Sequence, residues 1–297
     1  MVEKTTKSRL IFCIVNYTLL AVFGLICLIP LWHVLMASVS EPRLLMAASG
    51  IIFKPLGQAT LDGYGIVLSN SAVINGYLNT FIYVIANAVL GTLLTAVAGY
   101  LVSRKNFKLA KPLTGFIMFT MIFNGGLIPT YMVIRGLGMI NTRWAIILPA
   151  LMNAYYIIVM KSAFEQLAPA FEESAKIDGA GPVTTLFRIL LPLLKPTLVV
   201  IIMFAVIGQW NSWYPASIYL PRVREQWPLQ LIMRSLLIQN DVSKILTSTS
   251  ESNHVVNMTG NLVKYCVTVV GTLPILVAYP FAQRYFVTGI TLGGVKG

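Results

Sequence analysis

The sequence predicts an all-α membrane protein with six transmembrane helices, both ends of the chain in the cytoplasm, and a short cytoplasmic helix between the fourth and fifth spans. Three observations support this fold class. The mean hydropathy of the chain is +0.76, only 11% of its 297 residues are charged, and long apolar runs recur along it. An apolar run of about 20 residues can cross a bilayer as a helix, because a helix satisfies its own backbone hydrogen bonds there.

The six predicted spans cover roughly residues 10–37, 76–102, 113–134, 143–163, 187–210 and 262–283. The first follows a cationic tail and so resembles a signal peptide. Its apolar run is too long for a cleaved segment, and a retained helix is expected. The predicted organisation is therefore a tail at 1–9, a single transmembrane domain at 10–284 and a second tail at 285–297.

The cations predict the orientation of the spans. Four cations crowd the short second connection: Arg104, Lys105, Lys108 and Lys111. The third connection has only Arg135 and Arg143. Because cytoplasmic loops are richer in Lys and Arg, both tails and the loop 164–186 are expected in the cytoplasm, and the long loop 215–261 outside. A multi-pass protein of the bacterial cytoplasmic (inner) membrane, in contact with lipid, is the resulting prediction.

Several function classes find no support in the composition. The net charge of +12 lies mostly in cations that flank apolar runs, so nucleic-acid binding is not expected. The cysteines and histidines show no metal-ligand spacing, and no glycine-rich phosphate loop is present. The prediction is a chain without a metal, cofactor or catalytic residues, which does not bind ATP itself.

Helix interfaces are visible in the second predicted span. Gly91, Thr95 and Gly99 recur every four residues and would let another helix approach closely. This packing role is favoured over a substrate role. Prolines interrupt the third to sixth spans, and the backbone groups that they free need neighbours or a water-lined cavity. They are Pro129, Pro149, Pro192, Pro196, Pro274 and Pro280.

The acidic residues indicate how transport would be powered. All ten carboxylates lie outside the predicted spans. Ion-coupled carriers usually keep acidic or histidine relays within the membrane, so energy is expected to come from another subunit. An ion-coupled secondary carrier or channel that acts without an ATPase is the alternative.

Four of those acids lie in the loop 164–186, and its local sequence predicts two helices. Pro169 suits a first helical turn, and Glu172 and Glu173 follow where carboxylates favour the helix dipole. Gly179 and Gly181 can end that helix and reverse the chain, after which a second helix would run into the fifth span.

This loop resembles the cytoplasmic loop of ABC importer permeases. The family pattern is Glu-Ala-Ala, three residues, Gly, nine residues and Ile-x-Leu-Pro, matched here by Glu173, Ser174, Ala175, Gly179, Ile189, Leu191 and Pro192. Ser174 departs from the pattern by a change between small residues. Asp178, Gly179 and Ala180 are typical of the sugar-importing branch. Segments 123–150, 208–220 and 283–297 also resemble maltose-transporter permeases, in particular those that import oligosaccharides such as alginate fragments.

The resemblance implies a permease subunit of an ATP-driven sugar importer, without catalytic residues. Its helix pair at 169–182 would dock on an ATPase, with Glu173 and Gly179 as main determinants, and Glu172 would belong to the same coupling loop. Two ATPase subunits would bind ATP and Mg²⁺ and drive alternating access. A second related permease and an extracytoplasmic sugar-binding protein are the other implied partners. The tail around Gly293–Gly297 resembles one that reaches toward the ATPases.

Candidates for the substrate path are aromatic and amide residues of the third and fourth spans and of the outer end of the fifth, because sugars bind aromatic faces and amides. They are Asn124, Asn153, Tyr155, Tyr156, Gln209, Trp210, Asn211, Trp213 and Tyr214. An interfacial aromatic belt explains the 209–214 cluster equally well, and helix packing explains the others at least as well. The segment 229–238 predicts an amphipathic helix that lies on the membrane or against the binding protein.

Overall fold

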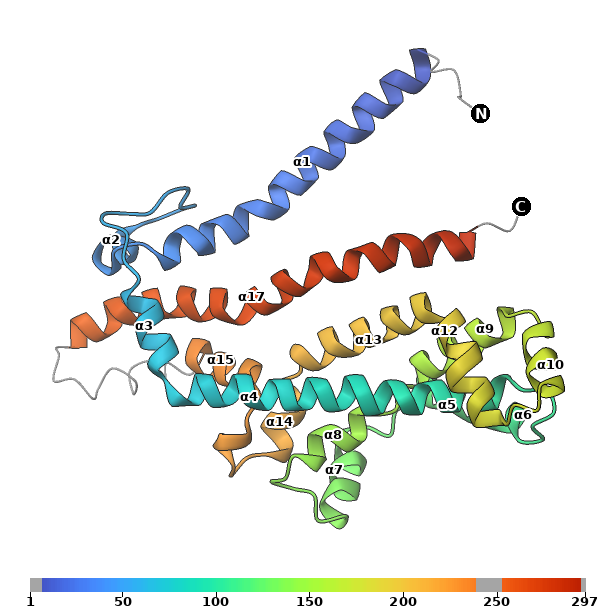
Figure 1. Cartoon of the computed structure of the whole chain (residues 1–297). Coiled ribbons are helices and arrows are strands. Elements are labelled where there is room, and N and C mark those ends of the chain that lie inside the picture. The colour runs from blue at the N-terminus through green and yellow to red at the C-terminus, as the bar shows by residue number, and fades with distance from the viewer. Residues whose placement is uncertain (1–6, 239–252, 295–297) are drawn as a thin grey trace. The chain divides into compact units, whose positions relative to one another are not determined.

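The computed structural model of the chain describes residues 7–238 and 253–294, and every regular element in these ranges is a helix (Figure 1). The elements are α1 (Lys7–Ser38), α2 (Pro42–Ala47), α3 (Asp62–Ser69), α4 (Ser71–Ala86), η1 (Asn87–Gly91), α5 (Thr92–Ser103), α6 (Ala110–Ile122), α7 (Leu127–Gly136), α8 (Trp144–Ala150), α9 (Ala154–Gln166), α10 (Ala170–Ile177), α11 (Pro182–Thr184), η2 (Thr185–Leu190), α12 (Leu191–Leu193), α13 (Lys195–Trp210), α14 (Tyr214–Tyr219), η3 (Arg224–Gln226), α15 (Leu229–Ile238) and α17 (Asn253–Gly294). The predicted all-α class is confirmed.

Four helical stretches of the described chain are long and apolar enough to cross a membrane, and the number rises to six if each of two bent helix pairs counts as one span. The four are Lys7–Ser38, Ser71–Ser103, Trp144–Gln166 and Thr259–Val277. The bent pairs are Ala110–Ile122 with Leu127–Gly136, at 118°, and Pro182–Leu193 with Lys195–Trp210, at 87°. Counted in this way, the six spans agree with the sequence, and the spans predicted at 113–134 and 187–210 are each broken, after Ile122 and after Leu193.

Both bends have local causes. Gly126 has a φ of +83°, a value that residues with a side chain rarely adopt. Its N–H donates to the Asn124 side-chain oxygen at 3.0 Å. The second bend follows Leu194, where α12 ends and Pro196 occupies the first turn of α13. A proline fits the first turn of a helix, because N–H groups in that turn have no acceptor within the helix and the missing N–H of proline therefore breaks no hydrogen bond.

The helix ends differ slightly from the predicted tails. α1 begins at Lys7, inside the predicted tail 1–9, and α17 continues through the predicted boundary at 284 to Gly294. Residues 1–6 and 295–297 lie outside the described part of the chain. Within the predicted 10–284 domain, the chain folds as two compact units.

The first unit comprises Met1–Asn70 and Met233–Thr272. Its polar contacts converge on the end of α1, where the Ser38 and Tyr64 hydroxyls lie 2.6 Å apart. Burial raises the pKa of the Tyr64 hydroxyl above its ordinary value, so this phenol stays neutral and shares a hydrogen bond with Ser38. The Cys266 thiol donates to the Ser38 carbonyl at 3.3 Å, which fixes α17 to the end of α1.

The second unit comprises Ser71–Ile232 and Leu273–Gly297 and contains most of the predicted functional residues. The predicted small-residue face packs α5 against α9. A Cβ added to Gly99 would lie 2.8 Å from the Met160 Cβ and 3.1 Å from the Lys161 nitrogen. One added to Gly91 would lie 3.0 Å from the Leu151 carbonyl oxygen. The predicted packing role of Gly91 and Gly99 is confirmed.

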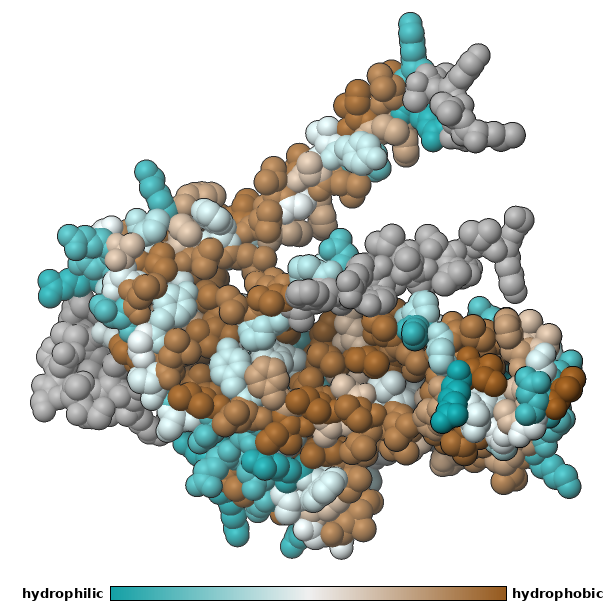
Figure 2. Space-filling view, in the orientation of Figure 1, coloured by the Kyte–Doolittle hydropathy of each residue, from teal (hydrophilic) through white to brown (hydrophobic). Residues whose placement is uncertain are grey.

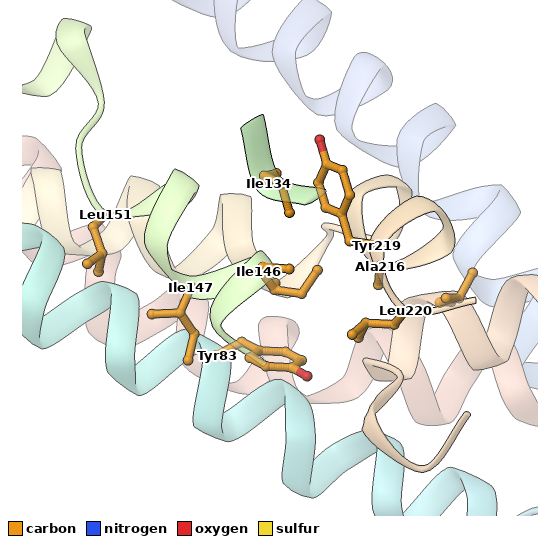
Figure 3. Packing of buried hydrophobic residues seen from close by; sticks show 10 residues of the cluster. Tyr83, Ile134, Ile146, Ile147, Leu151, Ala216, Tyr219 and Leu220 are labelled. Atoms are coloured by element: carbon orange, nitrogen blue, oxygen red, sulfur yellow. The ribbon is translucent and has the colours of Figure 1, made fainter. Parts of the chain in front are cut away.

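A cluster of buried hydrophobic side chains in this unit includes residues of the segment that follows α13. Ala216, Tyr219 and Leu220 pack on α4, α7 and α8, as Figure 3 shows for the side chains. The predicted outer loop therefore begins with packed helices α14, η3 and α15. The expected membrane-surface role of α15 is wrong, because its apolar side chains are buried, Leu229 fully and Leu231 and Ile232 nearly so. The polar stretch at 239–252 of this loop lies outside the described residues.

Candidate coupling site and substrate path

The coupling loop forms the helix that its sequence predicts. Pro169 lies at the N-cap of α10, and Glu172 and Glu173 occupy the first turn. Acidic residues in the first turn favour the positive end of the helix dipole, and Lys176 lies in the last turn, at the negative end. An eight-residue helix is marginal by itself, so its ends and its contacts with the bundle hold it in place.

A glycine ends α10 in the way that the spacing predicts. Gly179 has a φ of +76°, and its N–H donates to the Lys176 carbonyl at 3.0 Å. The Ala180 N–H donates to the Ala175 carbonyl at 2.8 Å, which completes a Schellman motif. Gly181 is extended, and Pro182 begins α11. The chain thus reverses within four residues and returns to the bundle, which confirms the predicted two-helix arrangement.

One side of α10 is attached to the bundle. Ala175 is buried, and the partly buried Glu172 carboxylate pairs with the Arg104 guanidinium. Lys176 Nζ lies 3.3 Å from the same carboxylate. The Arg104 guanidinium lies over the Tyr100 ring of α5 at 4.7 Å and near the Phe164 ring of α9 at 5.8 Å. Arg104 therefore connects three helices, a role beyond the orientation signal that its sequence position indicates.

The other side of the coupling helices is exposed and combines acidic with apolar groups. We call it the coupling surface; it consists of Phe171, Glu173, Ser174, Ile177, Asp178 and Val183. Ile177 is 86% exposed and Val183 is 69% exposed, next to charged residues that do not belong in lipid. An apolar surface of this kind, rimmed by charge, is typical of a protein-binding site.

The remaining residues of the predicted motif lie next to this surface and serve packing. Ile189 and Leu191 pack against the buried core formed by residues such as Leu186 and Leu190. Pro192 is exposed in α12. Thr185–Leu190 forms a π-helical turn, a feature often found at functional sites.

Two predicted substrate-path amides have structural partners. Asn124, expected within the third helix, lies instead in the break between α6 and α7, where it accepts from the Gly126 N–H. Asn153 caps α9 by accepting from the N–H groups of Tyr155 and Tyr156, at 2.9 and 3.4 Å. The rings of Tyr155 and Tyr156 lie edge to face, 6.0 Å apart.

The 209–214 cluster does not form one surface. Gln209 is buried and accepts from the Asn87 amide at 3.2 Å. Asn211 is exposed and donates to the Ile207 carbonyl at 3.0 Å. Trp213 and Tyr214 lie edge to face, 5.5 Å apart, one half-buried and the other half-exposed. These positions remain predictions for a substrate path.

Trp210 faces an apolar cavity. The lining residues come from α4, α13 and α17 and are Phe81, Val84, Met203, Val206, Ile207, Trp210, Pro274, Ile275 and Tyr279. A sugar needs hydrogen-bonding partners in addition to an aromatic face, and this lining is almost entirely apolar. The cavity therefore suits a hydrocarbon chain better than a sugar.

Comparison with known proteins places the chain in a family. Residues 91–292 match the family model described as the binding-protein-dependent transport system inner membrane component. The chain is 34% identical to the polygalacturonan/rhamnogalacturonan transport system permease protein YtcP of Bacillus subtilis, over 98% of this chain and 100% of that one. It is 30% identical to the galactooligosaccharides transport system permease protein GanQ of the same organism, over the full length of both.

A solved structure agrees with these relatives. The fold superimposes with a TM-score of 0.82 on a chain of a bacterial ABC transporter involved in the import of the acidic polysaccharide alginate. The two chains are 30% identical, and the match covers 95% of this chain and 99% of that one. The chain therefore belongs to the binding-protein-dependent transport system inner membrane components, the non-catalytic, multi-pass permease subunits of ABC importers.

Proposed function

We propose that this chain is the permease subunit of an ATP-driven oligosaccharide importer and moves its substrate by alternating access. Its family assigns it to the inner membrane and implies an ATPase and a binding protein as partners. Support for an oligosaccharide comes from relatives named for galactooligosaccharides, arabinooligosaccharides and maltodextrin. We further propose two ATPase subunits, which hold ATP and Mg²⁺, and a second, related permease.

The observation that carries this proposal is the coupling surface. The apolar side chains of Ile177 and Val183 project into solvent from a helix pair that is fixed at its other side by Arg104. A docked ATPase would cover this apolar area, and Glu173 supplies a charge for orientation. Because α10 is tied to α5 and α9, a displacement of the docked helix reaches the bundle directly.

The ion-coupled alternative is not favoured. Glu165 lies in the last turn of α9, at the end of the candidate span Trp144–Gln166. It is exposed and pairs with Lys161 at 2.7 Å, one helical turn away. A relay for ions would need acids deeper within the spans.

The test compares variants of the coupling surface in the complete reconstituted transporter. Glu173→Gln and Ile177→Ser should each lower binding-protein-stimulated ATP hydrolysis by about tenfold, since contacts at the centre of an interface contribute about 1–2 kcal/mol. Glu165→Gln removes an exposed carboxylate outside the surface and should leave hydrolysis unchanged. Full stimulation of both surface variants would refute the docking role, and transport without any ATPase would refute the importer itself.

A further inference from the structure

Three arginines are gathered at the end of the second unit that is remote from α10. They are Arg143 at the start of α8 and Arg222 and Arg224 in the segment after α14, and all three are exposed. We call this group the arginine cluster. Figure 2 shows hydrophilic residues gathered in the region of α14, beside the apolar surface of the long helices.

The long helical stretch Ser71–Ser103 separates the arginine cluster from the coupling site. This continuous stretch is formed by α4, η1 and α5 (Figure 1). Asn79, which contacts the cluster, lies in its first half, and Arg104, which contacts α10, directly follows its last residue. Twenty-five residues at 1.5 Å each correspond to about 37 Å, more than the roughly 30 Å of a bilayer core. If α10 meets a cytoplasmic ATPase, the arginine cluster lies on the outer side, where substrate arrives.

A buried asparagine builds the cluster. Asn79 is 2% exposed and donates to the carbonyls of Glu225 and Trp227, at 2.6 and 3.2 Å. Its side-chain oxygen accepts from Arg143 Nη2 at 2.9 Å. One side chain of α4 therefore holds both the guanidinium of Arg143 and the backbone turn that follows Arg224.

A second asparagine fixes the other arginine. Asn141 accepts from the Arg222 N–H at 3.1 Å, and its own N–H donates to the Tyr219 carbonyl at 2.8 Å. Its φ of 61° is unusual for a residue with a side chain, although asparagine tolerates this region best. The segment after Arg224 is also fixed to α4, because the Tyr83 hydroxyl donates to the Gln226 carbonyl at 2.7 Å. Tyr83 belongs to the buried cluster that Figure 3 shows.

The described carboxylates do not neutralise the charge of the cluster. Within the described residues, none of its arginines makes an ion pair. The Arg224 guanidinium lies over the Trp227 ring at 5.0 Å, a cation–π contact that leaves its charge in place. Glu225 is the one carboxylate in this turn, so three positive charges and one negative charge leave a local net charge of +2.

We infer that the arginine cluster recognises the carboxylates of an acidic, uronate-containing oligosaccharide as it enters the transporter. This inference rests on the proposed function and specifies its substrate class. Planar guanidinium groups on a rigid turn match carboxylates in bidentate geometry, which a neutral sugar cannot use. Two relatives are named for polymers of uronate sugars, polygalacturonan and alginate, which agrees with this charge.

The first experiment measures what the cognate binding protein carries. The probes are trigalacturonate and the same trisaccharide with its carboxyl groups reduced to alcohols, which differ only in charge. We expect binding of trigalacturonate at least about tenfold tighter, the equivalent of one charge-assisted hydrogen bond. A binding protein that prefers the neutral trisaccharide, in a transporter that still couples ATP hydrolysis to its uptake, would overturn the acidic substrate and leave the importer function intact.

The second experiment assigns the cluster itself. The double variant Arg222→Gln/Arg224→Gln in the reconstituted complex should lower uptake of trigalacturonate about tenfold at saturating binding protein. The affinity of the ligand-free binding protein for the complex should not change. Arg43→Gln, an exposed arginine of α2 outside the cluster, is the matched control. Weaker docking of the binding protein would show that the cluster contacts that protein instead, and unchanged uptake would show that it contacts neither; both results overturn the inference.

Discussion

At the scale of single residues, Arg104 is the contact that joins the coupling helix to the bundle. Its guanidinium is held between the Glu172 carboxylate and the Tyr100 ring, with side-chain exposures of 23% for Arg104 and 18% for Glu172. A partly buried, charge-assisted contact of this kind contributes more than an exposed surface pair. With an ATPase docked on α10 as proposed, this contact would carry displacement of α10 into α5.

Exchange of the two charges tests this role. Arg104→Glu and Glu172→Arg should each reduce the amount of sugar moved per ATP hydrolysed, because each leaves two like charges at the contact. The double exchange should recover part of the loss, with a coupling energy of about 1–2 kcal/mol. Arg104→Lys should not substitute fully, because a lysine lacks the planar group that stacks on Tyr100. Strictly additive losses in the double variant would contradict a direct contact.

The sequence predicts some residue roles well and others poorly, for a physical reason. The end of α10 at Gly179 depends on neighbours within five residues, so a local pattern is sufficient to predict it. The pair between Arg104 and Glu172 joins residues 68 positions apart, and no local pattern specifies it. The aromatic-amide cluster at 209–214 is divided between core and surface, because helical geometry turns Gln209 into the core and leaves Asn211 exposed.

At the scale of elements, apolar runs predict which segments cross the membrane but not where they bend. Composition predicts a span across 113–134 and Pro129 predicts an interruption, but the chain turns at Gly126, whose positive φ lies where α7 bends away from α6 by 118°. Hydropathy averages over such a residue and cannot detect it. The periodic apolar face of α15 likewise predicts an amphipathic helix, but it does not predict which surface covers that face.

The reversal after α10 offers a matched pair of glycines. Gly179→Ala places a side chain at a φ of +76°, which costs about 1–2 kcal/mol. Gly181→Ala is unstrained, because Gly181 is extended and no atom lies within 4 Å of the added Cβ. We expect the first variant to lose much of its stimulated ATP hydrolysis and the second to keep it, measured in the reconstituted complex. Equal activity of both variants would mean that the Schellman turn does not position the coupling surface.

At the scale of the whole molecule, the proposed orientation places the coupling surface in the cytoplasm and the arginine cluster outside. The basis is the length of Ser71–Ser103 together with the docking proposal for α10. This arrangement also agrees with the cations of the 104–111 connection, which favour the cytoplasmic side.

Thiol labelling in intact cells tests that orientation. In a chain without Cys13, Cys27 and Cys266, the variants Ile177→Cys and Arg222→Cys each introduce one exposed thiol. A maleimide that cannot cross the membrane should label the position 222 variant in intact cells and the position 177 variant only after the cells are opened. The reverse pattern would contradict the orientation and, with it, the location of the arginine cluster.

The stretch Ser71–Ser103 has a consequence for motion. It bears the Arg104 contact at one end and the Asn79 contact at the other, and its middle contains the π-turn Asn87–Gly91, pinned to α13 by the hydrogen bond to Gln209. A rod held near its centre acts as a lever with a pivot. If the whole stretch tilts by about 10°, its ends separate sideways by about 6 Å over the 37 Å between the two contacts. A push on α10 would thereby swing the opposite end of the stretch, which bears Asn79 and holds the arginine cluster, in the opposite direction.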